Sequence, residues 1–141
     1  MQRHFRRSFD SLDEIFGFIG DFFGTASIDE SLSYAVSFAV EELFTNMVKY
    51  NPTGPDEILI GLAAVDGGIR VELVDYDSEP FDVSRAPRPR TDAPLKERTP
   101  GGLGLHLVKH MVDSLRYEYQ DRRSTITFTR TTGSRDVRDQ A

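Results

Sequence analysis

Apolar residues recur at spacings of three and four along two long stretches of the chain, a pattern that predicts two amphipathic helices. The first predicted helix is capped by Asp10 or Ser11 and runs to about Gly24. Its apolar positions are Leu12, Ile15, Phe16, Ile19, Phe22 and Phe23. The second predicted helix runs from about Ser27 to Tyr50. Its inward apolar positions are Leu32, Ala35, Val36, Ala39, Leu43 and Met47.

Alternating apolar positions predict strands before and after these helices. The predicted strands are an edge strand at 2–9, a hairpin of 57–65 and 69–74, and a final pair at 115–120 and 125–130. The hairpin connection, 66–68, reads Asp-Gly-Gly, a strong tight-turn signal that favours antiparallel pairing. A third helix of about ten residues is expected after Gly104. Its apolar positions are Leu105, Leu107, Val108 and Met111.

Residues 80–100 differ in composition from the rest of the chain, because they hold most of the prolines and several basic residues with few apolar neighbours. A loop of this length inside a compact domain is usually a functional lid or a disordered segment, and we expect a lid. The order of elements predicts one α+β domain over residues 1–131. It is a two-layer sandwich in which three helices cover one face of a mixed, mostly antiparallel sheet. Residues 132–141 are polar and are expected to form a disordered tail.

Composition narrows the classes of function. With 17 Lys and Arg against 23 Asp and Glu, the net charge of −6 provides no basic field that would attract nucleic acid or an anionic membrane. The sequence contains no cysteine, which excludes disulfides and thiolate zinc sites. No apolar run has the length of a membrane-spanning helix or the form of a signal peptide. We therefore expect a cytoplasmic protein without direct nucleic-acid or membrane contact.

Glu42, Asn46 and Lys49 share one edge of the second predicted helix, because they are separated by four and three residues. An asparagine carbonyl oxygen can ligate Mg²⁺, and a nearby glutamate can orient or deprotonate a nucleophile. Read alone, this spacing is also typical of a solvated helix surface. Its interpretation therefore depends on the rest of the site.

The segment Gly101-Gly102-Leu103-Gly104-Leu105 directly precedes the third predicted helix. Glycines there allow backbone N–H groups to approach an anion that also experiences the positive helix end, which suits phosphate. The alternative is that the glycines merely end the loop. A Walker loop is excluded because no Gly-Lys-Ser/Thr follows, and a Rossmann motif fits poorly because a loop precedes the glycines. Asp75 and Asp77, at a strand end, are candidate acceptors for the adenine amino group or simply part of a polar turn.

These segments, in this order, resemble the GHKL ATPase superfamily and, within it, the anti-sigma regulatory factors, which are stand-alone serine kinases of bacterial partner-switching systems. Residues 39–50, AVEELFTNMVKY, resemble the family's N box. This implies Glu42 as general base, Asn46 as Mg²⁺ ligand and Lys49 near the phosphates. Residues 101–109, GGLGLHLVK, resemble the second glycine box.

The first glycine box of the family departs from the pattern in this sequence. The family reads Asp-x-Gly shortly before Pro-Phe, whereas here Ser78 stands in the glycine position and Tyr76 in the aspartate position. A shift of one residue would let Asp75 or Asp77 contact adenine. Thr127, in the last predicted strand, is the position that the resemblance suggests for the family's threonine near adenine.

The resemblance implies an ATP- and Mg²⁺-dependent serine/threonine protein kinase that is also an anti-sigma factor. Its expected partners are a STAS-type anti-anti-sigma protein as substrate, a sigma factor and, by analogy with the family, a second copy of the chain. The main alternative is a regulator-binding module that transfers no phosphate, which the altered first box favours. An isolated histidine-kinase ATPase domain is less favoured, because the chain begins almost directly with the predicted ATPase core and His4, His106 and His110 look incidental.

Overall fold

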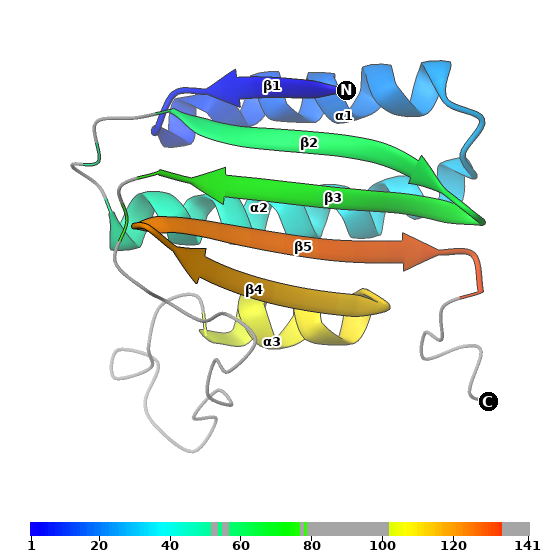
Figure 1. Cartoon of the computed structure of the whole chain (residues 1–141). Coiled ribbons are helices and arrows are strands. Elements are labelled where there is room, and N and C mark those ends of the chain that lie inside the picture. Colours follow the sequence, from blue (N-terminus) through cyan, green and yellow to red (C-terminus); the bar gives the residue numbers. More distant parts are fainter. Residues whose placement is uncertain (52–53, 55–56, 77, 79–101, 134–141) are drawn as a thin grey trace.

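The computed structural model describes residues 1–51, 54, 57–76, 78 and 102–133. In this part of the chain, three α-helices lie on one face of a five-stranded sheet with the strand order β1-β2-β3-β5-β4 (Figure 1). The helices are α1 (Leu12–Thr25), α2 (Ser33–Tyr50) and α3 (Gly102–Met111). The strands are β1 (Gln2–Phe5), β2 (Ile58–Val65), β3 (Gly68–Asp75), β4 (Ser114–Gln120) and β5 (Arg123–Thr131). This arrangement confirms the predicted α+β sandwich.

All strand pairings described are antiparallel. The β2–β3 hairpin turns at Gly67, whose positive φ of 77° explains the glycine in the predicted turn. The second hairpin, β4–β5, inserts β5 beside β3 and leaves β4 at the edge. The predicted lid, residues 80–100, and residues 134–141 of the predicted tail lie outside the described residues.

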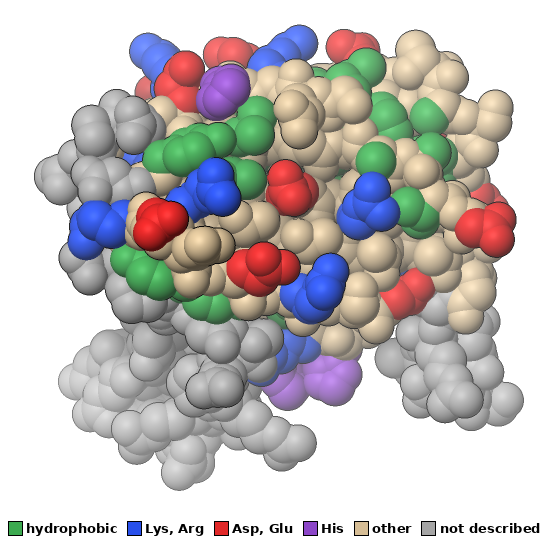
Figure 2. Space-filling model, in the orientation of Figure 1, with side chains coloured by type: hydrophobic (Ala, Val, Ile, Leu, Met, Phe, Trp, Pro, Cys, Tyr) green, Lys and Arg blue, Asp and Glu red, His purple; other side chains and the backbone are tan. Residues whose placement is uncertain are grey.

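The core lies between the sheet and the helices, and it is formed by one face of each strand. The fully buried sheet residues include Ile58, Ile60, Ile69, Val71, Leu73 and Phe128. None of the described helices lies on the other face, and Figure 2 shows acidic and basic side chains interspersed over it. None of the described helices is long and apolar enough to cross a membrane.

Two details of the predicted helix faces were wrong. In α1 Phe18 is buried together with the predicted Phe22 and Phe23, whereas Phe16 is only partly buried. Phe18 follows Ile15 by three residues and so shares its face. In α3 the buried residues are Leu105 and Val108, whereas Leu107 is 41% exposed. Leu107 lies roughly 200° around the helix from Leu105 and therefore faces outward.

Candidate functional site

Asn46 lies in the last turns of α2 and is 2% exposed. Its Nδ2 donates to the carbonyl oxygen of Glu42 at 2.6 Å, which orients the amide. Its Oδ1 is buried and has no hydrogen-bond partner among the residues that the structure describes. Leaving such an oxygen unpaired costs about 1–3 kcal/mol, so the position is suited to a ligand that supplies the missing partner. The Asn46 carbonyl oxygen therefore fits the predicted role of cation ligand.

Gly104 brings the start of α3 against the side chain of Glu42. A Cβ added at residue 104 would lie 3.0 Å from Glu42 Oε1 and still closer to Oε2 and Cδ. Real Cβ atoms essentially never approach other atoms more closely than 3.0 Å, so only glycine lets the helix begin here with the carboxylate in place. The structure thus brings the predicted base and the second glycine motif together, although they lie far apart in the sequence.

Burial is the main cause that raises the pKa of the Glu42 carboxyl above its usual value. The negative charge of Glu41 raises this pKa further, whereas the positive charge of Lys49 lowers it. Lys49 is exposed at the end of α2. A glutamate with a raised pKa is a better proton acceptor near neutral pH than an ordinary surface glutamate.

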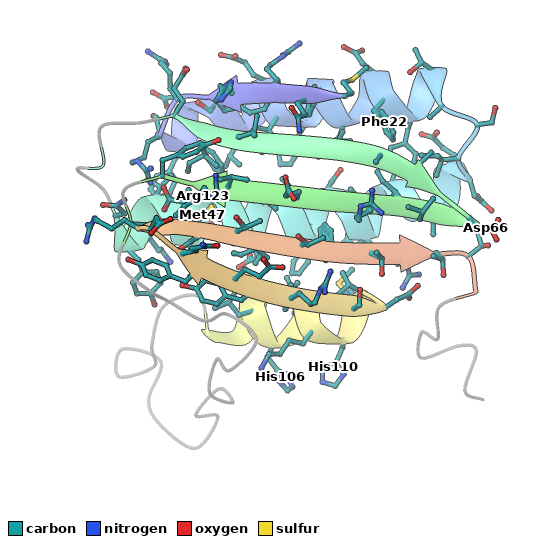
Figure 3. The ribbon with its side chains drawn as sticks, viewed as in Figure 1. Phe22, Met47, Asp66, His106, His110 and Arg123 are labelled. Carbon is teal, nitrogen blue, oxygen red and sulfur yellow. The ribbon has the colours of Figure 1, made fainter. Side chains whose placement is uncertain are left out.

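A pocket lies beside Asn46, between α2 and the strands β3 and β5. It encloses about 370 Å³ of empty space, open solvent at its mouth included. Its lining includes Asn46, Met47, Asp75, Ser78, Ser124 and Ile126. Figure 3 marks this end of the molecule by Met47 on α2 and Arg123 at the start of β5. The pocket therefore combines an apolar lining with polar groups at one end.

Asp75 is the carboxylate that the fold places in this pocket, at the end of β3. It is 3% exposed and forms an ion pair with Arg7. Tyr76, the next residue, lines the open face of the sheet, because successive strand residues point to opposite faces. The strand register therefore favours Asp75 over Tyr76, while Asp77 lies outside the described residues.

Ser78 and Ser124 form a buried hydroxyl pair at the polar end of the pocket. Their Oγ atoms are 2.8 Å apart, and the hydroxyl of Tyr117 lies 3.3 Å from Ser124 Oγ. The backbone N–H of Ser78 donates to the carbonyl oxygen of Arg122 at 2.8 Å, and Tyr119 donates to the Ser78 carbonyl oxygen. Ser78 is thus an integral part of the pocket wall.

Sequence reasoning missed Ser124 and selected Thr127 instead. The structure does not bring Thr127 to the pocket, since its side chain lines the open face of the sheet. The alternation of β5 could have indicated Ser124, because it shares its face with the core residues Ile126 and Phe128.

Of the remaining predicted site residues in the glycine segment, some belong to α3 and one lies outside the described residues. Gly102 and Leu103 begin α3, and Leu105 is buried in the core at 4% exposure. Gly101 lies outside the described residues. His106 and His110 lie on the side of α3 that points away from the sheet (Figure 3), with their ring centroids 4.6 Å apart.

Comparison with known proteins identifies a family and a similar solved fold. A family model described as histidine kinase-like ATPase domain matches residues 5–130. No curated protein matches the chain. A similar fold occurs in the crystal structure of the RsbU and RsbW domains of Rv1364c from Mycobacterium tuberculosis, with a TM-score of 0.66 and 14% sequence identity. That match covers 93% of this chain and 31% of the other, and at this identity the likeness concerns the fold alone.

Proposed function

We propose, on the premise that this chain belongs to the histidine kinase-like ATPase family, that it binds ATP with Mg²⁺ and phosphorylates a STAS-type anti-anti-sigma protein on serine or threonine. In this proposal the chain is also the anti-sigma factor that the unphosphorylated STAS protein displaces from a sigma factor. The motifs at 39–50 and 101–109 support this branch of the family through their resemblance to anti-sigma regulatory factors. The fold shared with a chain containing an RsbW domain is consistent with it.

The observation that carries the proposal is the contact between Gly104 and the Glu42 carboxylate, beside the unpaired buried oxygen of Asn46. A proton acceptor, a cation ligand and the N-terminus of a helix meet at one place. Phosphoryl transfer needs this combination, because its catalysis consists mainly of positioning and charge stabilisation.

Glu42 acts on the incoming hydroxyl. The hydroxyl oxygen forms a bond to the γ-phosphorus of ATP, the bond from that phosphorus to the β,γ-bridging oxygen breaks, and ADP leaves with the bond's electron pair. The hydroxyl proton passes to the Glu42 carboxylate. The raised pKa of Glu42, caused mainly by burial, suits this step because it strengthens the carboxylate as a base.

Asn46 Oδ1 would hold the metal ion, and a bound Mg²⁺ would neutralise part of the negative charge of the phosphates. The described residues contain no group of three His, Asp or Glu side chains that could hold a metal ion. Proteins commonly bind Mg²⁺ through one or two side chains together with the phosphates of the substrate. The backbone N–H groups at the start of α3 would donate hydrogen bonds to the phosphates in this proposal.

The adenine ring of ATP occupies the other end of the pocket in this proposal. Asp75 accepts a hydrogen bond from the 6-amino group of adenine. One O–H of the Ser78–Ser124 pair is used in the bond between them, and the other is a donor for a ring nitrogen. Met47 and Ile126 provide apolar contact with the ring.

The test is transfer of the γ-phosphoryl group of labelled ATP, with Mg²⁺, to a panel of STAS-domain proteins from the source organism. We expect a labelled serine or threonine with the wild-type chain and none with Glu42→Gln, although Glu42→Gln retains ATP binding. Nucleotide binding by the wild type without any labelled partner would refute the kinase. It would support the regulator-binding module, which Ser78 in the glycine position of the first box favours.

A further inference from the structure

We infer that Arg7 is a positioning residue that sets the specificity of the pocket for the nucleobase. It holds one carboxylate oxygen of Asp75, so that the other oxygen can accept a hydrogen bond from the amino group of a 6-aminopurine. The inference rests on the proposed nucleotide function and extends it to a residue outside the family motifs described above.

The first observation is the buried ion pair between the Arg7 guanidinium and Asp75. Arg7 follows β1 at the N-terminus, whereas Asp75 ends β3, so 68 positions separate them in the sequence. Both side chains are 4% exposed. A buried ion pair commonly adds little stability compared with apolar residues of the same size, because both charges lose their hydration. Because Asp75 of this pair lines the pocket, the pair points to a role in recognition.

The second observation concerns the two carboxylate oxygens. Arg7 Nη2 donates to Oδ1 of Asp75. Its Oδ2 accepts no hydrogen bond from the residues that the structure describes, and Asp75 lines the pocket. Rotation of an aspartate carboxylate about its last torsion is soft, so an anchor on one oxygen fixes the direction of the other. The anchored carboxylate can only accept hydrogen bonds, which matches an amino group and opposes a carbonyl group.

The third observation is that Gly54 lies close against the guanidinium of Arg7, which pairs with Asp75. A Cβ added at Gly54 would lie 2.7 Å from Arg7 Nε and 2.8 Å from its Cζ. Glycine at residue 54 therefore lets the segment after α2 approach the guanidinium closely. Arg7 is confined from two sides, by Asp75 and by the backbone at Gly54.

Removing Arg7 removes the anchor on Oδ1 of Asp75. The carboxylate can then rotate about its last torsion, so neither oxygen is held in the direction of the 6-position of the purine. The hydrogen bond that distinguishes the 6-amino group of adenine from the 6-oxo group of inosine is weakened as a result. The inference therefore predicts a change in the ratio of two affinities.

The experiment measures dissociation constants of ADP and inosine 5′-diphosphate, with Mg²⁺, by calorimetry. For the wild type we expect preference for ADP by about ten- to a hundredfold, the value of one hydrogen bond to a charged group. In Arg7→Met we expect this preference to fall below about threefold. Arg6→Met is the matched control, since Arg6 is the exposed neighbour of Arg7, and its preference should equal that of the wild type.

Arg7→Lys keeps the positive charge and should retain part of the preference for ADP over inosine 5′-diphosphate. If thermal melting shows that Arg7→Met does not fold, Arg7→Lys is the variant that tests the inference. If Arg7→Met, or in that case Arg7→Lys, weakened both nucleotides equally and left the preference unchanged, Arg7 would be purely structural and the inference would be wrong. If the wild type bound neither nucleotide, the proposed function would fail together with the inference. Wild-type ADP binding with an unchanged preference in the variants would remove the inference alone.

Discussion

Replacing Gly104 by alanine should separate the stability of this protein from its phosphoryl transfer. The new Cβ would lie too close to the Glu42 carboxylate, closer than the 3.0 Å limit for two of its atoms. The carboxylate is the far end of a flexible side chain, so it can swing aside at little energetic cost. To regain ordinary contact it must move by at least about 1 Å, and a displacement of that size typically costs about a hundredfold in rate.

The stability of the variant should change in the opposite direction. Gly104 belongs to α3, and alanine is favoured over glycine in a helix by up to about 1 kcal/mol. We therefore expect a free energy of unfolding equal to that of the wild type or slightly higher, measured by urea denaturation. Initial rates of transfer from labelled ATP to the STAS substrate should fall by about a hundredfold.

Gly20→Ala is the matched control, because Gly20 lies in α1 and nothing is within 4 Å of the Cβ that it would gain. It should raise the free energy of unfolding by about 0.5–1 kcal/mol without changing the transfer rate. A Gly104→Ala protein that transfers phosphate at the wild-type rate would refute the role assigned to the Glu42–Gly104 contact. Loss of rate together with loss of folding would contradict the stability argument.

Three further predictions concern the proposed metal ligand Asn46, the proposed general base Glu42 and the adenine end of the site. Asn46→Ala should abolish the gain in ATP affinity that Mg²⁺ provides, measured by calorimetry with and without the ion; a gain that persists would exclude Asn46 as ligand. Transfer should fall as acid protonates Glu42, and Glu41→Gln should move this limb of the pH–rate profile to lower pH, because it removes a charge that raises the Glu42 pKa; no movement would argue against Glu42 as the base. Ser124→Ala should weaken ADP binding and lower the free energy of unfolding by about 1–2 kcal/mol, because it removes the hydroxyl bonded to Ser78. Thr127→Ala should leave ADP binding unchanged. Weaker ADP binding in Thr127→Ala but not in Ser124→Ala would restore Thr127 as the residue near adenine.

The metal and phosphate half of the candidate site follows from short-range patterns. Glu42 and Asn46 are four residues apart on one helix, so helical geometry alone puts them on one edge. The glycine segment also marks the start of α3, although α3 begins at Gly102, within the segment, and not after Gly104 as predicted. Both features depend on residues close in the sequence, which is why they could be recognised before the structure.

The adenine half could not be predicted in the same way. Counting from the family motif put Tyr76 in the aspartate position, but the pleat of β3 turns Tyr76 to the open face and Asp75 to the pocket. The choice between Ser124 and Thr127 depended equally on which face of β5 meets the core. An error of one residue reverses the face of a strand side chain, so strand positions tolerate less uncertainty than helix positions.

The sequence by itself determined the helices, the strands and the two motifs that carry the catalytic interpretation, because these depend on local periodicity and local hydrogen bonding. The tertiary structure alone decided which distant groups meet: Gly104 with the Glu42 carboxylate, and Arg7 with Asp75. Such pairs arise when the strand order and the packing of the helices are fixed, and no periodicity within either segment encodes them. The base specificity inferred for this pocket depends on the second of these pairs.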